Sequence, residues 1–115
     1  MIKLKAFASM YTKTVYVVFT DNDYIDKYEL YRDDILVGTF LKDDMFFNHQ
    51  GESGKLIRPC MFDNDHHTNL FFKESTHQWM YEDKDIQPFK EYKYYVKYYH
   101  EDYSVITDNV YVTMG

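Results

Sequence analysis

The alternation of apolar and polar residues is clearest near the C-terminal end of the chain, where residues 91–101 read EYKYYVKYYHE. Successive side chains of a β-strand point to opposite faces of the sheet. A helix would instead scatter these residues around its axis, so the pattern predicts one long strand. One face of it would carry Tyr92, Tyr94, Val96 and Tyr98, and the other Lys93, Tyr95, Lys97 and Tyr99.

The same alternation predicts strands elsewhere. Residues 27–40, KYELYRDDILVGTF, predict a hairpin with its turn at the RDD triplet. Residues 12–21, TKTVYVVFTD, predict a strand with Val15, Val17 and Phe19 on one face and Tyr16 and Val18 on the other. Toward the C-terminus we expect a strand at 78–83, a corner at 84–90, a turn at 102–107 and a last strand at 108–115.

The middle of the chain, residues 41–78, has a less regular pattern. Short apolar runs alternate there with loop-like clusters at 51–54 and 63–67. We expect two or three short strands, in the segments MFF, IRPCMF and NLFFKE. Pro59 cannot donate a hydrogen bond to a strand ladder, so it is expected at a strand edge or at a bulge.

The segment IQPFKEYKYYV carries a resemblance to a known family. The apolar residue Ile86 is followed two residues later by Pro88, and four residues after that by Tyr92. This spacing resembles the fibronectin type III pattern, in which alternating inward residues, here Tyr94 and Val96, continue the strand. Residues 27–40 also look like the C and C′ strands of bacterial modules of this family, and residues 80–113 are similar to their E, F and G strands.

The resemblance implies an all-β fold, an immunoglobulin-like, fibronectin type III-like antiparallel β-sandwich with an expanded segment between the C′ and E strands. The chain would be one domain over residues 1–115, with an insertion-like segment at 41–78. Tyr92 would then be the tyrosine of the E-to-F corner, with a buried ring and a hydroxyl bonded to the backbone a few residues upstream. The structural residues implied by the family are Phe19, which stands where a tryptophan is common, and Tyr28, Leu30, Ile86, Pro88, Tyr92, Tyr94 and Val96.

Composition narrows the class of protein. The chain has 115 residues, 45% of them hydrophobic and 20% aromatic, which suits one folded domain rich in β-structure. Its net charge of −6 argues against nucleic acid as a partner, and we expect no membrane insertion because no apolar run is long enough to span a bilayer. The single cysteine, Cys60, excludes an intrachain disulfide and leaves the compartment open. The family resemblance alone suggests extracellular, cell-surface or virion settings.

Five tyrosines are candidates for a binding surface, because alternation would turn them outward on one sheet. Exposed aromatic rings stack on sugars or anchor protein partners. The alternative is that cross-strand aromatic pairs simply stabilise the sheet. The candidate residues are Tyr16, Tyr31, Tyr95, Tyr99 and Tyr111.

Other residues could carry chemistry, but a simpler interpretation is available for each. Asp63, Asp65, His66 and His67 could bind a metal ion, but a solvated loop is the default interpretation. The Asp-rich turn at 21–26 lacks the glycine and the glutamate of an EF-hand loop. Cys60 is flanked by apolar residues, and no catalytic motif occurs, so we expect neither a cofactor, a bound metal nor an enzyme. We expect Trp79 to pack inside the fold.

The sequence therefore predicts a non-catalytic binding or structural module that mediates protein–protein interaction or assembly, including self-association. A carbohydrate-binding module that uses the tyrosine face is the alternative. In a further alternative, residues 41–78 supply an unprotected strand that pairs with another chain. A small enzyme or metal protein built on the His/Asp loop is a third.

Overall fold

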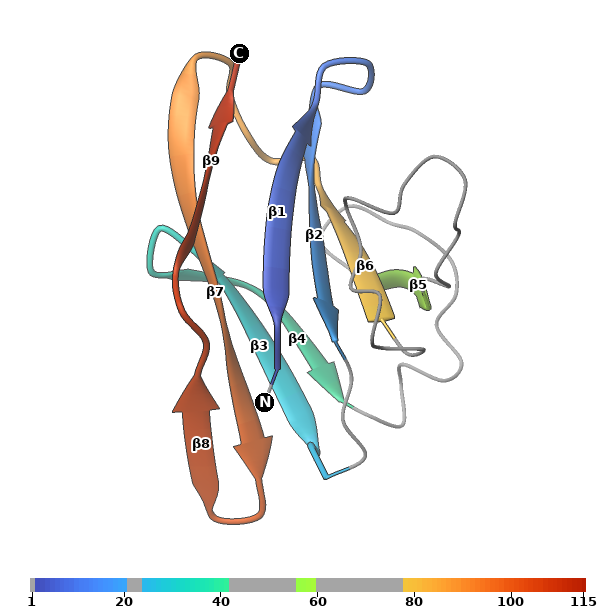
Figure 1. Cartoon of the computed structure of the whole chain (residues 1–115), viewed down its shortest axis with the longest axis vertical. Helices are drawn as coiled ribbons and strands as arrows, with labels where there is room; N and C mark the ends of the chain where they lie inside the picture. The colour runs from blue at the N-terminus through green and yellow to red at the C-terminus, as the bar shows by residue number, and fades with distance from the viewer. Residues whose placement is uncertain (1, 21–23, 42–55, 60–77) are drawn as a thin grey trace.

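The computed structural model describes residues 2–20, 24–41, 56–59 and 78–115. Within these ranges the chain forms nine β-strands in two sheets and no helix, and every strand pair is antiparallel (Figure 1). The prediction of an all-β, antiparallel fold is confirmed at this level. The predicted segments MFF and NLFFKE lie outside the described residues.

The first sheet has four strands in the order β1-β2-β6-β5. β5 is an edge strand that ends at Pro59, and its register with β6 shifts between Leu56 and Arg58. Pro59 therefore lies where a residue without a backbone N–H is tolerated. The bounds of the strands are β1 Leu4–Ser9, β2 Thr14–Thr20, β5 Leu56–Pro59 and β6 Gln78–Asp83.

The second sheet has five strands, with β7 at its centre. β3 pairs with one side of β7, and β8 and β9 pair with successive parts of the other side. β4 continues the sheet beyond β3, so the predicted hairpin at 27–40 is confirmed. The bounds are β3 Lys27–Arg32, β4 Ile35–Leu41, β7 Lys90–His100, β8 Tyr103–Ile106 and β9 Val110–Met114.

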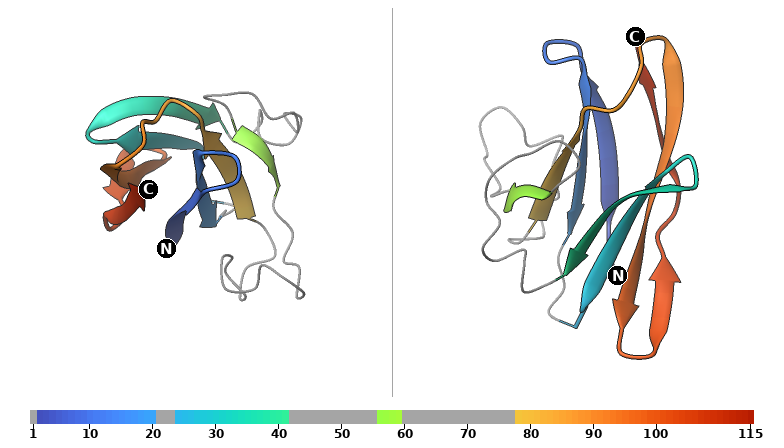
Figure 2. Two further views of the ribbon diagram at one scale, coloured as in Figure 1. Left: turned by 90° about the horizontal axis from the view of Figure 1, so that it is seen from above. Right: turned by 180° about the vertical axis from the view of Figure 1, so that it is seen from behind.

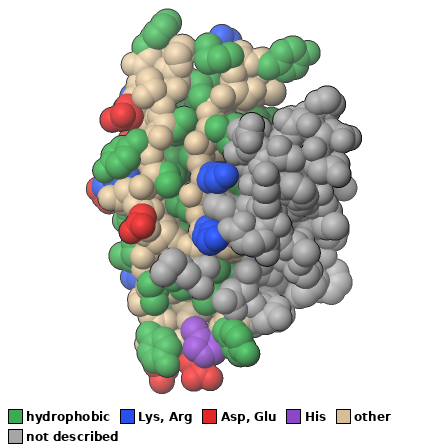
Figure 3. Space-filling model, in the orientation of Figure 1, with side chains coloured by type: hydrophobic (Ala, Val, Ile, Leu, Met, Phe, Trp, Pro, Cys, Tyr) green, Lys and Arg blue, Asp and Glu red, His purple; other side chains and the backbone are tan. Residues whose placement is uncertain are grey.

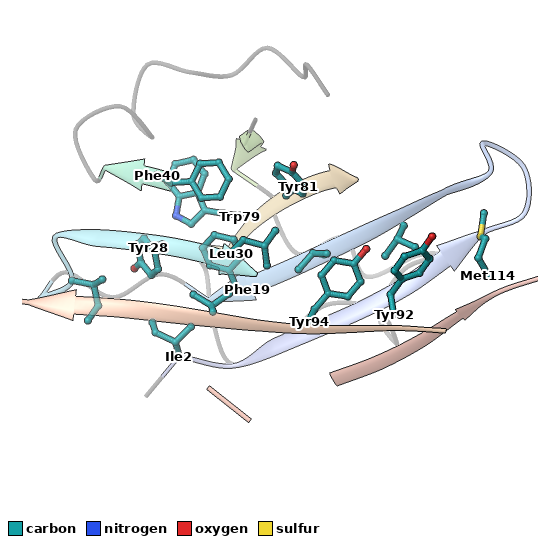
Figure 4. Packing of buried hydrophobic residues seen from close by; sticks show 14 residues of the cluster. Ile2, Phe19, Tyr28, Leu30, Phe40, Trp79, Tyr81, Tyr92, Tyr94 and Met114 are labelled. Atoms are coloured by element: carbon teal, nitrogen blue, oxygen red, sulfur yellow. The ribbon is translucent and has the colours of Figure 1, made fainter. Parts of the chain in front are cut away.

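The two sheets lie face to face with a hydrophobic core between them, an arrangement compatible with a β-sandwich (Figure 2). Both sheets contribute large side chains to it, as Figure 4 shows. Trp79 is buried in this core, next to Phe19 on the neighbouring strand, as the packing prediction requires. The buried cluster contains Ile2, Val15, Val17, Phe19, Ile25, Tyr28, Leu30, Phe40, Trp79, Tyr81, Tyr92, Tyr94, Val96 and Met114.

Two strands differ from the sequence-based expectation. Residues 102–107 were expected to form a turn, but the turn is confined to Glu101 and Asp102, and β8 follows it as a strand paired with β7. β1 was not predicted at all, because its inward residues, Leu4, Ala6 and Ala8, include two that are too small to give a strong apolar alternation.

Val18 is buried although its side chain points away from the core between the sheets. It lies on the face of β2 opposite the core residues, as alternation requires, yet it is fully buried. Its cross-strand partner Met80 is buried too, and neither residue belongs to the core cluster between the sheets. Burial on both faces accounts for the almost continuous apolar run of β2.

Candidate functional site

The outer face of the second sheet carries a mixed surface of tyrosines and lysines, which we call the Tyr–Lys face. It arises because polar and aromatic residues alternate with core residues along β3, β7 and β9. Cross-strand pairing then sets these side chains beside one another, with Lys27 opposite Tyr99, Glu29 opposite Lys97, Tyr31 opposite Tyr95 and Lys93 opposite Tyr111. The Tyr–Lys face consists of Lys27, Glu29, Tyr31, Lys93, Tyr95, Lys97, Tyr99 and Tyr111.

Tyr31 and Tyr95 stack on each other at the middle of this face. Their ring centroids are 4.9 Å apart and their planes differ by 11°. The ammonium of Lys93 lies 5.8 Å from the centroid of the Tyr95 ring. Each of the two tyrosine rings therefore covers one face of the other, so less of their π-surface can stack on a flat ligand.

Tyr99 is held by charged neighbours. The Nζ atoms of Lys27 and Lys97 lie 4.2 Å and 5.4 Å from its ring centroid. The Tyr99 hydroxyl donates a hydrogen bond to Glu29 Oε1 at 2.6 Å, and the Tyr31 hydroxyl donates to the same oxygen at 3.2 Å. These contacts are cation–π and charge-assisted interactions that fix the orientation of the rings.

The ionisation of these groups follows from the same contacts. Burial, followed by the hydrogen bond to Glu29, raises the pKa of the Tyr31 hydroxyl. Contact with the Tyr99 hydroxyl raises the pKa of the Lys97 ammonium. At one end of the face Lys93 Nζ lies 2.9 Å from Asp34 Oδ2, and this hydrogen bond lowers the pKa of Asp34 and raises that of Lys93. At neutral pH Lys93 and Lys97 are therefore cationic, and the Tyr31 hydroxyl is neutral.

Tyr111 is the most open member of the Tyr–Lys face, with 60% of its surface exposed. Three exposed apolar side chains border the face on the same side of the sheet. Their position follows from strand pairing, because each of them lies opposite Tyr31, Lys27 or Lys97. These apolar neighbours are Leu36, Leu41 and Ile106.

Tyr16 does not join this surface, which corrects the expectation of a single row of five tyrosines. β2 belongs to the first sheet, and Tyr16 stacks there on Phe7 of β1, with ring centroids 5.6 Å apart. Alternation along β2 gives the correct face, but it does not tell which of the two sheets the strand joins. The structure brings together only Tyr31, Tyr95, Tyr99 and Tyr111.

A buried carboxylate, which the sequence did not single out, joins the two sheets. Asp83 ends β6 on the inner face and is 1% exposed. Arg32 Nη1 from β3 donates to its two carboxylate oxygens at 2.9 Å and 2.7 Å, and the Tyr94 hydroxyl from β7 donates to Oδ2 at 2.7 Å. The backbone N–H of Asp85 adds a fourth hydrogen bond at 3.2 Å. We call Arg32, Asp83 and Tyr94 the buried network.

The buried network also shifts the ionisation of its members. Burial alone would lower the pKa of Arg32, but the hydrogen bond to Asp83 and the negative charges nearby together outweigh it, so the pKa is raised. Burial, followed by the hydrogen bond to Asp83, raises the pKa of Tyr94 well above the ordinary value for tyrosine. Arg32 and Asp83 form an ion pair, and Tyr94 stays neutral beside it. This is the pattern of a satisfied structural network, because no buried side-chain polar atom of these three residues lacks a hydrogen-bond partner.

Tyr92 lies on the same side of β7 as Tyr94, and both rings rise toward the first sheet (Figure 4). Its ring is buried, and its hydroxyl oxygen accepts a hydrogen bond from the backbone N–H of Gln87 at 2.6 Å. Gln87 lies between Ile86 and Pro88 in the corner that precedes β7. This is the geometry that a tyrosine corner requires.

No family model, curated protein or solved structure matches this chain. The function must therefore be argued from the surface and the interior of the molecule itself.

The candidate metal and catalytic residues lie mostly outside the described ranges. They include Cys60, Asp63, Asp65, His66 and His67. Among the described residues no group of three or more His, Cys, Asp or Glu side chains could hold a metal ion. The described ranges contain no helix that is long and apolar enough to cross a membrane.

Proposed function

We propose that this chain is a fibronectin type III-like β-sandwich that acts as a non-catalytic interaction module, and that its Tyr–Lys face contacts other protein chains, a second copy of this chain first among them. The observation that carries the proposal is the Tyr–Lys face itself, on which tyrosines with fixed orientations lie among charges of both signs and exposed apolar residues.

The strand order supports the fold assignment. The neighbours β1-β2-β6 correspond to strands A, B and E of the fibronectin type III fold, and β4-β3-β7-β9 correspond to C′, C, F and G. The corner before β7, where Tyr92 accepts a hydrogen bond from Gln87, supports the same assignment. β5 and β8 are additions to this framework.

The geometry of the rings favours protein over carbohydrate as the ligand. Sugars stack on open aromatic faces, whereas Tyr31 and Tyr95 cover each other and lysines lie over Tyr99. Protein interfaces are enriched in tyrosine because its ring gives a large contact area and its hydroxyl can bond at the rim. The rings on this face are held by their neighbours, so little side-chain freedom would be lost on binding.

The charges on the face are compatible with contact between two copies. A two-fold symmetric interface brings the same patch of two subunits together, so the patch must complement itself. Lysines and the carboxylate of Glu29 occur together on the Tyr–Lys face, and Asp34 lies at one end of it, so one copy can offer either sign to the other. A patch of one sign would repel its copy.

Sedimentation velocity over a concentration series tests the proposal. We expect the wild-type chain to associate as its concentration rises, and Tyr111→Ser to weaken association about tenfold or more, because the most exposed ring of the face is removed. Tyr11→Ser is the matched control, since Tyr11 is an exposed tyrosine in the turn between β1 and β2, away from the Tyr–Lys face. A wild-type chain that stays monomeric at every concentration would contradict self-association through this face.

A glycan array distinguishes the carbohydrate alternative. Binding of a glycan by the wild-type chain that is lost in Tyr99→Ala and retained in Tyr11→Ser would replace the protein-contact proposal. Absence of glycan binding, together with association that depends on Tyr111, would support it.

A further inference from the structure

The edge strand β8 has no protection of the kind that edge strands usually carry. Its four residues, Tyr-Ser-Val-Ile, are all exposed, and they include neither a charged residue nor a proline. Natural edge strands commonly use lysine, proline or a bulge to prevent pairing with other chains. β8 lies at the end of its sheet, on the opposite side of the molecule from β5 (Figure 1).

The inward side of β8 is open to solvent. Val105 pairs with Tyr98, and Tyr103 pairs with His100, so their side chains point to the core side of the sheet. Even so, 48% of Val105 and 66% of Tyr103 are exposed. Side chains on the core side are normally covered by the facing sheet, and here the facing sheet does not cover β8.

A groove of about 430 Å³ lies between β8 and the start of β1. Its apolar lining comes from Ile2, Leu4, Tyr98, Val105 and Val110. Lys3, Thr107 and Asp108 add polar atoms to its wall. Hydrophobic side chains are visible among charged ones along the side of the molecule where β8 and β9 lie (Figure 3). The groove can therefore take apolar side chains from a segment that runs beside β8.

The backbone of β8 offers hydrogen-bonding groups to such a segment. The Tyr99 carbonyl points toward β3, because it accepts a hydrogen bond from Asp26 N at 2.8 Å. Backbone groups of successive residues in a strand point to opposite sides, so those of Tyr98 point toward β8. Val105, which pairs with Tyr98, must direct its own groups back to β7. The N–H and C=O groups of Ser104 and Ile106 then point away from β7, and no strand of the described residues pairs with that edge.

The charges around β8 indicate what kind of segment fits. Glu101 and Asp102 precede the strand, and Asp108 follows it closely. If two copies paired β8 with β8 in antiparallel register, centred on Val105 so that Ser104 pairs with Ile106, Asp102 of one copy would face Asp108 of the other. Like charges directly opposite each other destabilise a strand pair. A segment with lysine or arginine at both ends would meet carboxylates instead.

We propose that β8 and the adjoining groove bind an extended segment of a partner protein, which adds to the second sheet as a further strand. The segment has alternating apolar residues that enter the groove and basic residues at its ends. This mode combines backbone hydrogen bonds for affinity with side-chain pockets for specificity. The site is separate from the Tyr–Lys face and does not depend on self-association.

Two synthetic peptides test the site by fluorescence anisotropy. They share an alternating Val/Thr centre, and one is flanked by lysines while the other is flanked by glutamates. We expect the lysine-flanked peptide to bind saturably and the glutamate-flanked peptide at least about tenfold more weakly. In the complex, hydrogen exchange of the Ser104 and Ile106 amides should slow, because these N–H groups become hydrogen-bonded. The absence of saturable binding, equal binding of both peptides, or unchanged exchange would overturn the proposal.

A pair of substitutions at one position isolates the backbone contribution. Ser104→Pro removes an N–H that points away from β7, so it leaves the β7–β8 ladder intact and should weaken peptide binding about tenfold. Ser104→Ala keeps the N–H and should bind as the wild type does. Val105→Lys tests the groove without a backbone change and should also weaken binding of the lysine-flanked peptide. If Tyr111→Ser abolishes binding while these β8 variants retain it, the peptide binds the Tyr–Lys face and the β8 site is refuted.

Discussion

The two sides of β7 place the same residue type in opposite surroundings. Tyr92 and Tyr94 point inward, are buried, and have hydroxyls bonded to Gln87 N and to Asp83. Tyr95 and Tyr99 point outward, are half-buried, and lie against Tyr31 and lysines. A buried hydroxyl without a partner is costly, whereas an exposed one can bond to water. The inner tyrosines therefore contribute to stability through their hydroxyls, and the outer ones contribute mainly a surface.

The largest expected effect concerns the carboxylate that holds the inner side together. Asp83→Asn should lower the free energy of unfolding by about 3 to 5 kcal/mol, because it leaves the largely buried Arg32 cation without its anionic partner. Urea denaturation measures this loss. Asp85→Asn is the matched control: Asp85 also lies within 3.5 Å of Arg32, but its side chain is 92% exposed, so little change is expected. Equal losses in both variants would contradict the proposed role of burial.

Alkaline pH should reveal the burial of the inner tyrosines. Burial raises the pKa of Tyr94 and of Tyr81, so both stay protonated in the folded chain at a pH where the unfolded chain, with its ordinary value of 10.0, has lost these protons. The stability that they contribute is complete below pH 10 and is lost as the pH rises from there. Each should add a slope of about 1.4 kcal/mol per pH unit.

Urea denaturation at a series of alkaline pH values checks this dependence, with tyrosinate absorbance recorded in parallel. The buried Tyr94 and Tyr81 should ionise only as the chain unfolds. Stability that stays constant from pH 9 to pH 11 would contradict the expectation.

Tyr92→Phe should produce a smaller loss. The ring remains in the core, but the hydrogen bond from Gln87 N at 2.6 Å is removed, at a cost of roughly 1 kcal/mol or more. The midpoint of chemical denaturation measures it. An unchanged midpoint would refute the assignment of Tyr92 as the corner tyrosine.

Tyr95→Phe, on the outer side, should have the smallest effect. The substitution keeps the stacking on Tyr31 and removes only a hydroxyl on a solvent-facing surface, so stability should change by less than about 0.5 kcal/mol. If this variant were as destabilised as Tyr92→Phe, the outer tyrosines would have to be regarded as structural residues of the same kind as the inner ones.

The sequence predicted the strands whose inner residues are large and regularly spaced. The segments that became β2, β3, β4, β6, β7 and β9 each carry such residues, including Phe19, Leu30 and Val96. β1 was missed because its inner face is mostly alanine. β8 was read as a turn because its short apolar run lies between Asp102 and Thr107, residues that also favour turns.

The sites were less predictable than the strands, because they depend on contacts between distant segments. Asp83 and Arg32 are 51 positions apart and belong to different sheets, so neither residue stands out in a local pattern. Tyr16 has the right alternation but lies on the other sheet, which only strand pairing reveals. The stacking of Tyr31 on Tyr95 likewise depends on the register of β3 with β7.

The central place of β7 has a consequence for the order in which the chain can fold during synthesis. β3, β8 and β9 all pair with β7, and Tyr94 of the buried network lies on it, yet β7 spans residues 90–100 of 115. The hairpin of β3 and β4 emerges from the ribosome much earlier, with the inward side chains of Tyr28 and Leu30 still uncovered. The second sheet can therefore close only after β7 has been made, and until then the apolar side of the hairpin is exposed to contacts that favour aggregation.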